Sequence, residues 1–548
     1  MLAISACAAN EPDVATPAVV GQEGTQNIAE EFAGESIVRI AVADTPVLDP
    51  AVGVTEAAAI LYVNMYDTLV WPNHDGTISL WVAESYEVSP DGLIWDFTIQ
   101  PGILFHNGDE MRASDVAFSM NRIITIGQGW GPIFDARVRY AEAIDDFVVR
   151  FHLHAPNGTF LSTLVRLYIL SERQVMENAV DGPYGEFGDF GMAYLRNNAA
   201  GSGPYRLREF AQDQFVEIER FPYHWAGFHE NNPDAGRFIV VGETITQRAM
   251  MARRELEITD PFMSIETYFA MAEEDGIRLA GLFKADLMSL SMNVTRPPLD
   301  CEHVRRALAW TMDYESIVTD IYPGSRRVTS NVTPSIPGVS LNAFTGFYLN
   351  LDRAREELAL SRYAENIANY PIEVAWISIT PDREKLALML QANATQVGFN
   401  INVVSVPWPT IVETSMHPET TFQMITIRTV PPYIEAGAFF ELSHLSREIG
   451  NFNTTTWAFS ERLDAQIMEA IQTIDFDERM AKFVEMQDEF MATVPKIPLF
   501  EQFFYYAYQY TYLEWGVSER QRAGLPASAP ISGYNMQLRD MRIFPERR

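Results

Sequence analysis

The sequence contains little cysteine, few basic residues and no long apolar run. Only two cysteines occur in 548 residues, and the unlike contexts of Cys7 and Cys301 argue against a disulfide between them. No apolar run approaches the roughly 18 residues of a membrane-spanning helix, since the segment 161–170 is too short and contains Arg166. With 40 Lys and Arg against 73 Asp and Glu, the net charge is −33. Nucleic acid and anionic lipid need a basic surface, so neither is expected as the main partner.

Motifs of catalysis and cofactor binding are also absent from the sequence. It has no phosphate-binding loop, nucleophile elbow, HExxH or CxxC. His152 and His154 would lie on one face of a strand and could offer two metal ligands, but no third ligand is evident and a solvated strand face explains them better. Asp145 and Asp146 would point to opposite faces of a strand, which makes them a poor acid–base couple. We therefore expect neither an enzyme nor a cofactor or resident metal.

The first 35 residues differ in composition from the rest. Ile4-Ser5-Ala6-Cys7 resembles a bacterial lipobox, whose cysteine becomes the lipidated first residue of the mature chain, although fewer residues precede it than a signal peptide has. Residues 8–35 contain six acidic residues and no Lys or Arg, and such a segment cannot bury enough apolar surface to fold. We expect residues 1–35 to be a lipoprotein signal remnant and a disordered acidic tether, with Cys7 as the lipidation site.

The segment 71–125 combines turn, strand and helix signals. Three dipeptides that tolerate positive φ divide it, namely Asp75-Gly76, Asp91-Gly92 and Asn107-Gly108. Apolar and polar residues alternate from Leu93 to Gln100, which is typical of a half-buried antiparallel strand. Apolar residues then recur at helical spacing from 116 to 124, with Ser114 as the expected helix cap. The segment is predicted to be a small meander closed by a helix.

The rest of the chain suggests an α/β protein of more than one domain. At 548 residues, 47% of them apolar, the chain exceeds the usual size of a single core. A first strand is predicted at 37–42. After residue 293 strands and helices alternate. The predicted elements are a helix at 302–318, a strand at 371–379, a helix at 383–397, a strand at 400–406, and helices at 461–474 and 478–491.

Several motifs, in a fixed order, resemble one family of transport receptors. They are YDTLV at 66–70, AESYEVSPDGLIWDFTIQPGILFHNGDEMRASDVAFS at 83–119, GSGPY at 201–205, NVTRPPLDCEHVRRALAWTMD at 293–313 and IPL at 497–499. Together they resemble the signature of the family 5 solute-binding proteins of ABC importers, the dipeptide, oligopeptide and nickel receptor family. Ordered motifs spread over roughly residues 36–510 are more specific than any single one.

The resemblance implies an α/β, two-lobed, periplasmic-binding-protein-like fold of type II with an extra inserted subdomain. Lobe I would comprise residues 36–70, 196–290 and 505–548, the inserted subdomain residues 71–195, and lobe II residues 291–504. The chain would cross between the lobes near residues 290 and 504, and these crossings would form a hinge that lets the lobes close around a ligand.

The resemblance also implies a function. We expect an extracytoplasmic lipoprotein that captures a peptide-like solute and presents it to the permease subunits of an ABC importer. Such a protein would be a monomer, would touch the membrane only through its lipid anchor and would not change its ligand. An oligosaccharide receptor of the same family is the alternative, and a nickel or metal-chelate receptor is a more distant one.

The family's known ligand anchors are missing from this sequence. Dipeptide receptors of the family hold the ligand's amine with an aspartate and its carboxylate with an arginine and a tyrosine. An ungapped comparison places Pro432 at the first position, and Ile377 and Ile379 at the other two. Because losing charged anchors from a closed pocket is costly, we expect either a longer peptide held as an added strand or a sugar stacked on aromatic rings.

Candidate ligand contacts are therefore sought elsewhere in lobe II. Arg428 could bind a carboxylate or phosphate bidentately, and Glu435 could supply a negative group. Four aromatic residues could serve as platforms, although each also suits a core. The predicted ligand-binding residues are Trp408, Arg428, Tyr433, Glu435, Phe439 and Trp457.

Overall fold

The computed structural model describes residues 36–378, 380, 382–525, 527 and 529–548. A four-stranded sheet begins lobe I and has the order β1-β10-β9-β8. Its strands are β1 (Ile37–Val42), β10 (Ala235–Val240), β9 (Phe215–Arg220) and β8 (Tyr205–Ala211). β1 runs parallel to β10, and the other pairs are antiparallel. β1 is wholly buried, and it matches the first strand predicted from the sequence.

A second four-stranded sheet lies in the predicted inserted subdomain, with the order β4-β5-β7-β6. Its strands are β4 (Ala83–Val88), β5 (Ile94–Ile99), β7 (Val148–Leu153) and β6 (Val138–Asp145). Trp95 and Phe97 of β5 are buried, as their alternation predicts. The helix α3 (Ala113–Ile126) follows, but the prediction that Ser114 caps it is wrong. The cap is Arg112, two residues earlier, because the carboxylate of Asp115 accepts the backbone N–H of Arg112 and so fixes the start of the helix.

The third sheet has six strands in the order β12-β16-β11-β15-β13-β14. Its strands are β12 (Arg326–Arg327), β16 (Lys496–Gln509), β11 (Ile277–Met292), β15 (Met424–Thr429), β13 (Ile372–Ile377) and β14 (Ile401–Val406). The helices α13 (Asp382–Thr395), α16 (Glu461–Gln472) and α17 (Phe476–Ala492) complete the α/β pattern predicted for this region.

The helix predicted at 302–318 is interrupted. It consists of α10 (Glu302–Ala309), the single turn α11 (Tyr314–Ser316) and the π-helical η3 (Ile317–Ile321). The interruption has a local cause, since the carboxylate of Asp313 accepts the backbone N–H of Ser316 and starts a new helix.

Shorter elements connect the sheets. The further helices are α2 (Glu56–Met65), α4 (Gly131–Asp135), α5 (Phe160–Thr163), α6 (Glu172–Glu177), α7 (Met192–Leu195), α8 (Thr244–Ala252), α9 (Ile265–Ala272), α12 (Leu351–Ala359), α14 (Trp408–Thr414), α15 (Gly437–His444) and α18 (Gly516–Arg522). The further strands are β2 (Val70–Pro72), β3 (Ile78–Leu80), β17 (Leu513–Trp515) and β18 (Met541–Ile543). Among the described residues, no helix combines the length and apolarity that a membrane crossing requires.

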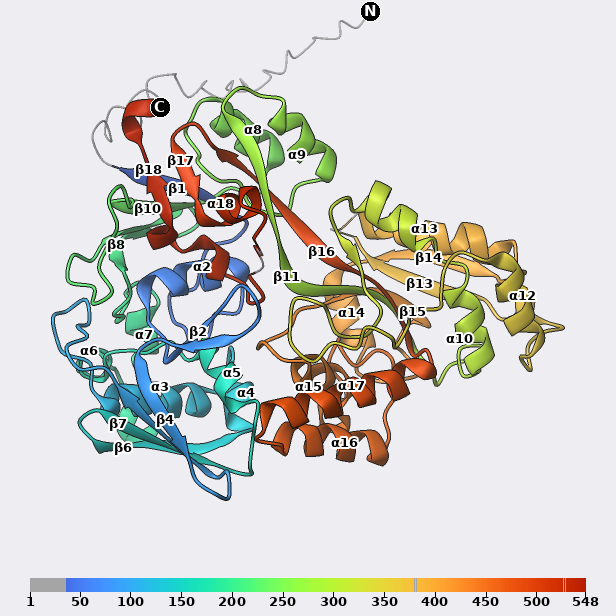
Figure 1. The fold of residues 1–548 in the computed structure, drawn as a ribbon, viewed down its shortest axis with the longest axis horizontal. Helices are drawn as coiled ribbons and strands as arrows, with labels where there is room; N and C mark the ends of the chain where they lie inside the picture. The colour runs from blue at the N-terminus through green and yellow to red at the C-terminus, as the bar shows by residue number, and fades with distance from the viewer. Residues whose placement is uncertain (1–35, 379, 381, 526, 528) are drawn as a thin grey trace, which may run out of the picture.

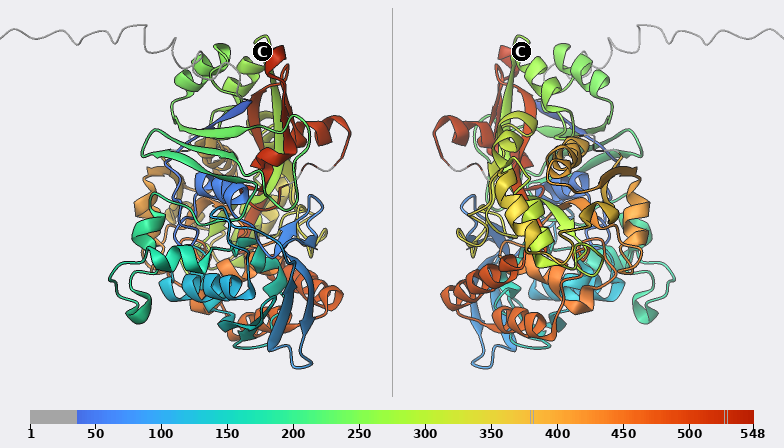
Figure 2. Two further views of the ribbon diagram at one scale, coloured as in Figure 1. Left: turned by 90° about the vertical axis from the view of Figure 1, so that its left-hand side faces the viewer. Right: turned by 90° about the vertical axis from the view of Figure 1, so that its right-hand side faces the viewer.

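Two long strands join the two predicted lobes. β11 and β16 run antiparallel from the region of α8 and α9 into lobe II, as Figure 1 shows, and the turned views of Figure 2 place α8 and α9 at the same end as the C-terminus. Both predicted crossing points, near 290 and 504, fall within these strands. Their pairing is irregular between Phe283 and Leu287, where the buried Ala285 has a φ of +60°. Such a bulge bends its strand and re-aims the side chains beside it.

The Gly-Ser-Gly motif at 201–203 has a packing explanation. A Cβ on Gly201 would lie 2.0 Å from the carbonyl oxygen of Met65, and one on Gly203 would lie 2.6 Å from the backbone nitrogen of Tyr66. Between them, the Ser202 hydroxyl donates to Asp67 at 2.9 Å. The motif therefore requires glycine because two stretches of backbone touch, and it joins two segments of the predicted lobe I that are far apart in sequence, residues 201–203 and the YDTLV segment.

Replacing Gly201 by alanine should destabilise the protein, because the neighbouring atom belongs to backbone that cannot move aside. We expect Gly201→Ala to lower the free energy of unfolding by about 3 kcal/mol, measured by urea denaturation. A Cβ on Gly346 would meet no neighbouring atom of the described residues within 4 Å, so Gly346→Ala should change stability by less than about 0.5 kcal/mol. Equal effects of the two substitutions would contradict this explanation.

Candidate functional site

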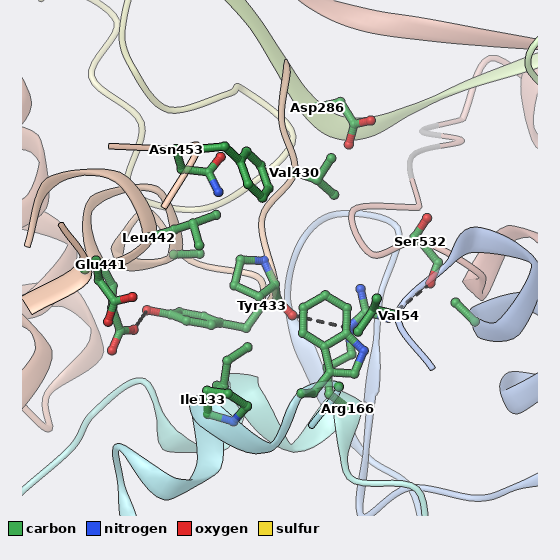
Figure 3. A pocket seen from close by; sticks show the side chains of 18 of the residues that line it. Val54, Ile133, Arg166, Asp286, Val430, Tyr433, Glu441, Leu442, Asn453 and Ser532 are labelled. Atoms are coloured by element: carbon green, nitrogen blue, oxygen red, sulfur yellow. Dashed lines mark hydrogen bonds between the residues drawn. The ribbon is translucent and has the colours of Figure 1, made fainter. Parts of the chain in front are cut away.

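A cavity of about 570 Å³ lies where the predicted lobe I, inserted subdomain and lobe II meet. Figure 3 shows side chains from all three parts facing it. Lobe I contributes Ser532 and residues 54–56, the last of which is the first residue of α2. The inserted subdomain contributes residues around α4 and Arg166. Lobe II contributes the segment after β15 and the start of α15. The volume suits a ligand of small-molecule size.

Much of the cavity wall is apolar. Val54 projects from lobe I, Trp130 and Ile133 from the inserted subdomain, and Val430 and Leu442 from lobe II. Burying apolar surface against such side chains favours binding at roughly 25 cal/mol per Å². The wall therefore fits a solute with an apolar body, and the few charged groups are left to determine its orientation.

A charged network crosses from the inserted subdomain to lobe II. Glu441 of α15 accepts hydrogen bonds from Arg137, from the Tyr433 hydroxyl at 2.9 Å and from Arg447 at 2.7 Å. Arg137 is almost fully buried and stacks over the Tyr433 ring at 5.1 Å. Burial, with the nearby Glu441 carboxylate, raises the pKa of Tyr433 well above its usual value. Glu441 thus joins the two sides of the cavity through an ion pair.

A second group of charges surrounds the β11 bulge. Lys284 pairs with Glu56, which also accepts the Tyr506 hydroxyl at 3.1 Å. Asp286 lies 3.4 Å from Arg428 of β15, and its Oδ1 has no hydrogen-bond partner among the described residues. Burial raises the pKa of Asp286 to about 6, although Arg428 and Lys284 oppose the shift. The two residues beside Ala285 therefore bring opposite charges to the junction of the lobes.

Arg166 of η1 (Leu164–Arg166) also lies in the cavity wall. It is 2% exposed. Its Nε donates to the Pro432 carbonyl at 3.3 Å and its Nη1 to the Ser532 carbonyl at 3.4 Å, as drawn in Figure 3. Its guanidinium lies 4.5 Å from the centre of the Trp130 ring. Arg166 therefore touches all three parts of the chain that form the cavity.

Two of the six residues predicted as ligand contacts line this cavity. Arg428 does so from β15 and Tyr433 from the segment that follows. Pro432, which stands where the dipeptide receptors carry their amine-binding aspartate, is also in the wall. The Tyr433 hydroxyl is already bonded to Glu441.

The other four predicted residues lie outside the cavity lining. Trp408 packs against Phe452 with ring centres 4.7 Å apart, and Phe439 is buried in the main core. The Trp457 indole donates to the Thr421 hydroxyl at 2.9 Å. The structure thus uses these three rings for packing.

Glu435 does not supply a free negative charge. It is buried and accepts two hydrogen bonds from Arg479 of α17, at 2.8 and 3.1 Å. Ile377, the first of the two residues at the carboxylate positions, is buried in a small apolar cluster. Ile379 and Cys7 lie outside the described residues.

His152, one of the two histidines considered as metal ligands, has a structural explanation. His152 stacks on Tyr140 with ring centres 4.2 Å apart and bonds to Glu142. No group of three or more His, Cys, Asp or Glu side chains in the described part of the chain is placed to hold a metal ion.

Sequence reasoning missed the contribution of the inserted subdomain to the cavity. Trp130, Arg137 and Arg166 all come from it. One signal was present in the sequence, because Arg166 interrupts an otherwise apolar stretch. An arginine in such a stretch is buried by its neighbours and needs an acceptor.

Comparison with known proteins gives consistent results. A family model described as "Bacterial extracellular solute-binding proteins, family 5 Middle" matches residues 77–451. The dipeptide-binding protein DppE of Bacillus subtilis is 22% identical over 526 residues, covering 91% of each chain. The substrate-binding protein CtaP of Listeria monocytogenes has a similar crystal structure, with a TM-score of 0.80 at 17% identity, covering 93% of this chain and 99% of CtaP.

A further similar structure is that of a dipeptide-binding protein from Pseudoalteromonas sp. SM9913 in complex with Met-Leu. Its TM-score is 0.73 at 18% identity, covering 93% of this chain and all of that one. At these identities the structural similarity establishes the shared two-lobed fold.

Neutralising Glu441 should weaken the contact between the inserted subdomain and lobe II. In Glu441→Gln, the nearly buried Arg137 loses its carboxylate, which costs about 3 kcal/mol in the closed arrangement. We expect a larger radius of gyration by small-angle X-ray scattering without ligand. The control is Glu489→Gln, which breaks an exposed pair with Arg462 on the same lobe. A radius unchanged in Glu441→Gln would show that this ion pair does not hold the two sides together.

Asp286 should make stability depend on pH. Its pKa is about 6 in the folded chain and about 3.9 when unfolded. Between these values the folded chain keeps the proton and the unfolded chain releases it, so stability falls as pH rises. Relative to Asp286→Asn, the wild type should lose about 2 kcal/mol of unfolding free energy from pH 4 to pH 7, measured by urea denaturation. The exposed Asp146→Asn should show no such difference, and parallel pH curves for wild type and Asp286→Asn would refute the expectation.

Proposed function

Because the chain belongs to the bacterial extracellular solute-binding proteins of family 5, we propose that it captures a peptide-like solute between its lobes and delivers it to the permease of an ABC importer. The observation that carries the proposal is the cavity at the junction of lobe I, the inserted subdomain and lobe II. DppE and the Met-Leu complex, both described as dipeptide-binding proteins, support a peptide as the solute. The relatives are binding proteins, and the proposal assigns no catalytic step to this chain.

The way the solute is held would differ from that in the dipeptide receptors. Pro432 has no charge with which to attract an amine, and Ile377 is packed in a core cluster. The peptide would be fixed by main-chain hydrogen bonds and apolar contacts, and by the charges that line the cavity. Arg428 and Tyr433 remain the proposed lobe II contacts, and the inserted subdomain adds Trp130 opposite them.

The proposed mechanism is closure of the two lobes about β11 and β16. We assign residues 36–70, 196–290 and 505–548 to lobe I, residues 71–195 to the inserted subdomain and residues 291–504 to lobe II. The bulge at Ala285 interrupts the pairing of the two long strands at the lobe junction. A hinge needs a few residues that absorb a change in φ and ψ, and residues 284–286 are proposed for that role.

The proposed location is outside the cytoplasm. The matching family is extracellular by its description, and a lipid on Cys7 followed by the acidic segment 8–35 would tether the monomer to a membrane. The protein would then meet its permease partner at the membrane surface with both lobes free to move.

The identity of the co-purifying ligand tests the proposed function. The folded protein would be examined by native mass spectrometry, and the ligand released under denaturing conditions would be sequenced. A series of peptides is expected, because the cavity is closed on several sides and should retain its ligand. A ladder of hexose masses would instead identify an oligosaccharide receptor, and a metal chelate would identify the third class. Either result would refute peptide capture.

Ligand-dependent compaction is the second expectation. Adding the recovered ligand to ligand-free protein should reduce the radius of gyration in small-angle scattering, because closure brings lobe II onto the inserted subdomain. A radius that is the same with and without ligand would contradict capture by lobe closure, even if a peptide binds.

A further inference from the structure

The charges around the cavity are paired with one exception. Four arginines line it, and three of them lie within 4 Å of a carboxylate: Arg137 and Arg447 at Glu441, and Arg428 at Asp286. The Glu56 carboxylate, also in the wall, is paired with Lys284. No carboxylate among the described residues forms an ion pair with the fourth arginine, Arg166.

The groups that contact Arg166 are neutral. Two of the five N–H groups of its guanidinium reach backbone carbonyls, at the long distances of 3.3 and 3.4 Å. The Trp130 ring covers one face at 4.5 Å, and the Tyr168 hydroxyl is a further neighbour. Carbonyl dipoles, a hydroxyl and a ring face stabilise a cation less than a carboxylate does. The positive charge is therefore solvated by dipoles but not neutralised.

A buried charge without a counter-ion is costly. Arg166 is 2% exposed, so solvent reaches almost none of its guanidinium. An isolated buried ion costs several kcal/mol. The chain as a whole is strongly acidic, with 73 acidic against 40 basic residues, so a lone buried cation in the cavity wall contrasts with the rest of the molecule.

We propose that Arg166 binds a carboxylate of the captured solute. The inference rests on the proposed function and names the chemical class of its solute as anionic. The planar fork of a guanidinium matches a carboxylate with two parallel hydrogen bonds. The anion would lie against the inserted subdomain and Trp130, whereas the family's dipeptide receptors hold the carboxylate on the strand of lobe II that here carries Ile377. The solute would therefore lie in a different orientation.

Two sources of the carboxylate are possible, the C-terminus of a peptide and an acidic side chain. Three tripeptide pools separate them. The first contains Ala, Leu and Phe with free C-termini, the second has the same sequences as C-terminal amides, and the third contains amides with one residue replaced by Glu. Binding of each pool to ligand-free protein would be measured by native mass spectrometry and, for the best binder, by titration calorimetry.

The variants are Arg166→Gln, Arg166→Lys and the control Arg173→Gln. Arg173 is an exposed arginine of the same subdomain, outside the cavity, paired with Asp109. In the wild type we expect carboxylate-bearing peptides to bind about 10- to 100-fold more tightly than neutral amides. Arg166→Gln should abolish this preference, Arg166→Lys should keep part of it, and Arg173→Gln should keep all of it. Strong binding of the Glu-containing amides would identify the side chain as the source.

The outcomes separate the two proposals. If the wild type binds acids and neutral amides equally, or if the preference survives in Arg166→Gln, Arg166 serves only to hold the Pro432 and Ser532 carbonyls and the anion site is refuted, while peptide capture stands. The wild-type comparison decides this even if Arg166→Gln fails to fold. If no pool binds, the anion site is refuted as stated for tripeptides, and peptide capture is decided separately by the identity of the co-purifying ligand.

Discussion

The pairing of β11 with β16 is the constraint on which the rest of the structure depends. These two paired strands extend through both predicted lobes. At one end, Tyr508 of β16 forms a bridge with Ile258, which in turn bridges Ile40 of β1. At the other end, β11 pairs with β15. A continuous ladder would make the two lobes one rigid sheet. The irregularity at residues 284–286 interrupts the ladder between the predicted lobes. Asp286 lines the cavity there, and Lys284 pairs with Glu56 of the cavity wall. The same bulge therefore interrupts the strand pairing and carries the two charged residues that lie at the junction.

The cavity is an interface between segments far apart in sequence. Arg137 meets Glu441 across 304 residues, and Arg166 meets the Pro432 carbonyl across 266. Each of these contacts joins the inserted subdomain to lobe II. In the proposed mechanism, closing the lobes and completing the cavity wall are therefore the same event, and a ligand that bridges the two sides would add to contacts that already favour closure.

Local elements could be predicted from the sequence, whereas the site could not. β1, β13 and β14 follow from runs of apolar and β-branched residues, and the alternation around Trp95 correctly assigns its face, because a strand's periodicity depends only on neighbouring residues. The break in the predicted helix 302–318 after Ala309 does not follow from periodicity, because it depends on a single carboxylate, that of Asp313, which caps a new helix. Glu435 was misjudged because its partner Arg479 lies 44 residues away. A pairing at that separation leaves no periodic signal, and the same holds for every ion pair that crosses the cavity.

The charge of the whole chain and the charge of the cavity act at different ranges. A net charge of −33 repels an anionic solute at a distance, but salt screens that repulsion beyond about 8 Å at physiological ionic strength. Inside the cavity screening is weak, and the nearest groups decide the interaction. Around the cavity the carboxylates of Glu56, Asp286 and Glu441 already have cationic partners, so they repel an incoming anion little. An acidic surface and an anion-binding cavity are therefore compatible, and discrimination would arise only after the solute has entered and the lobes have closed.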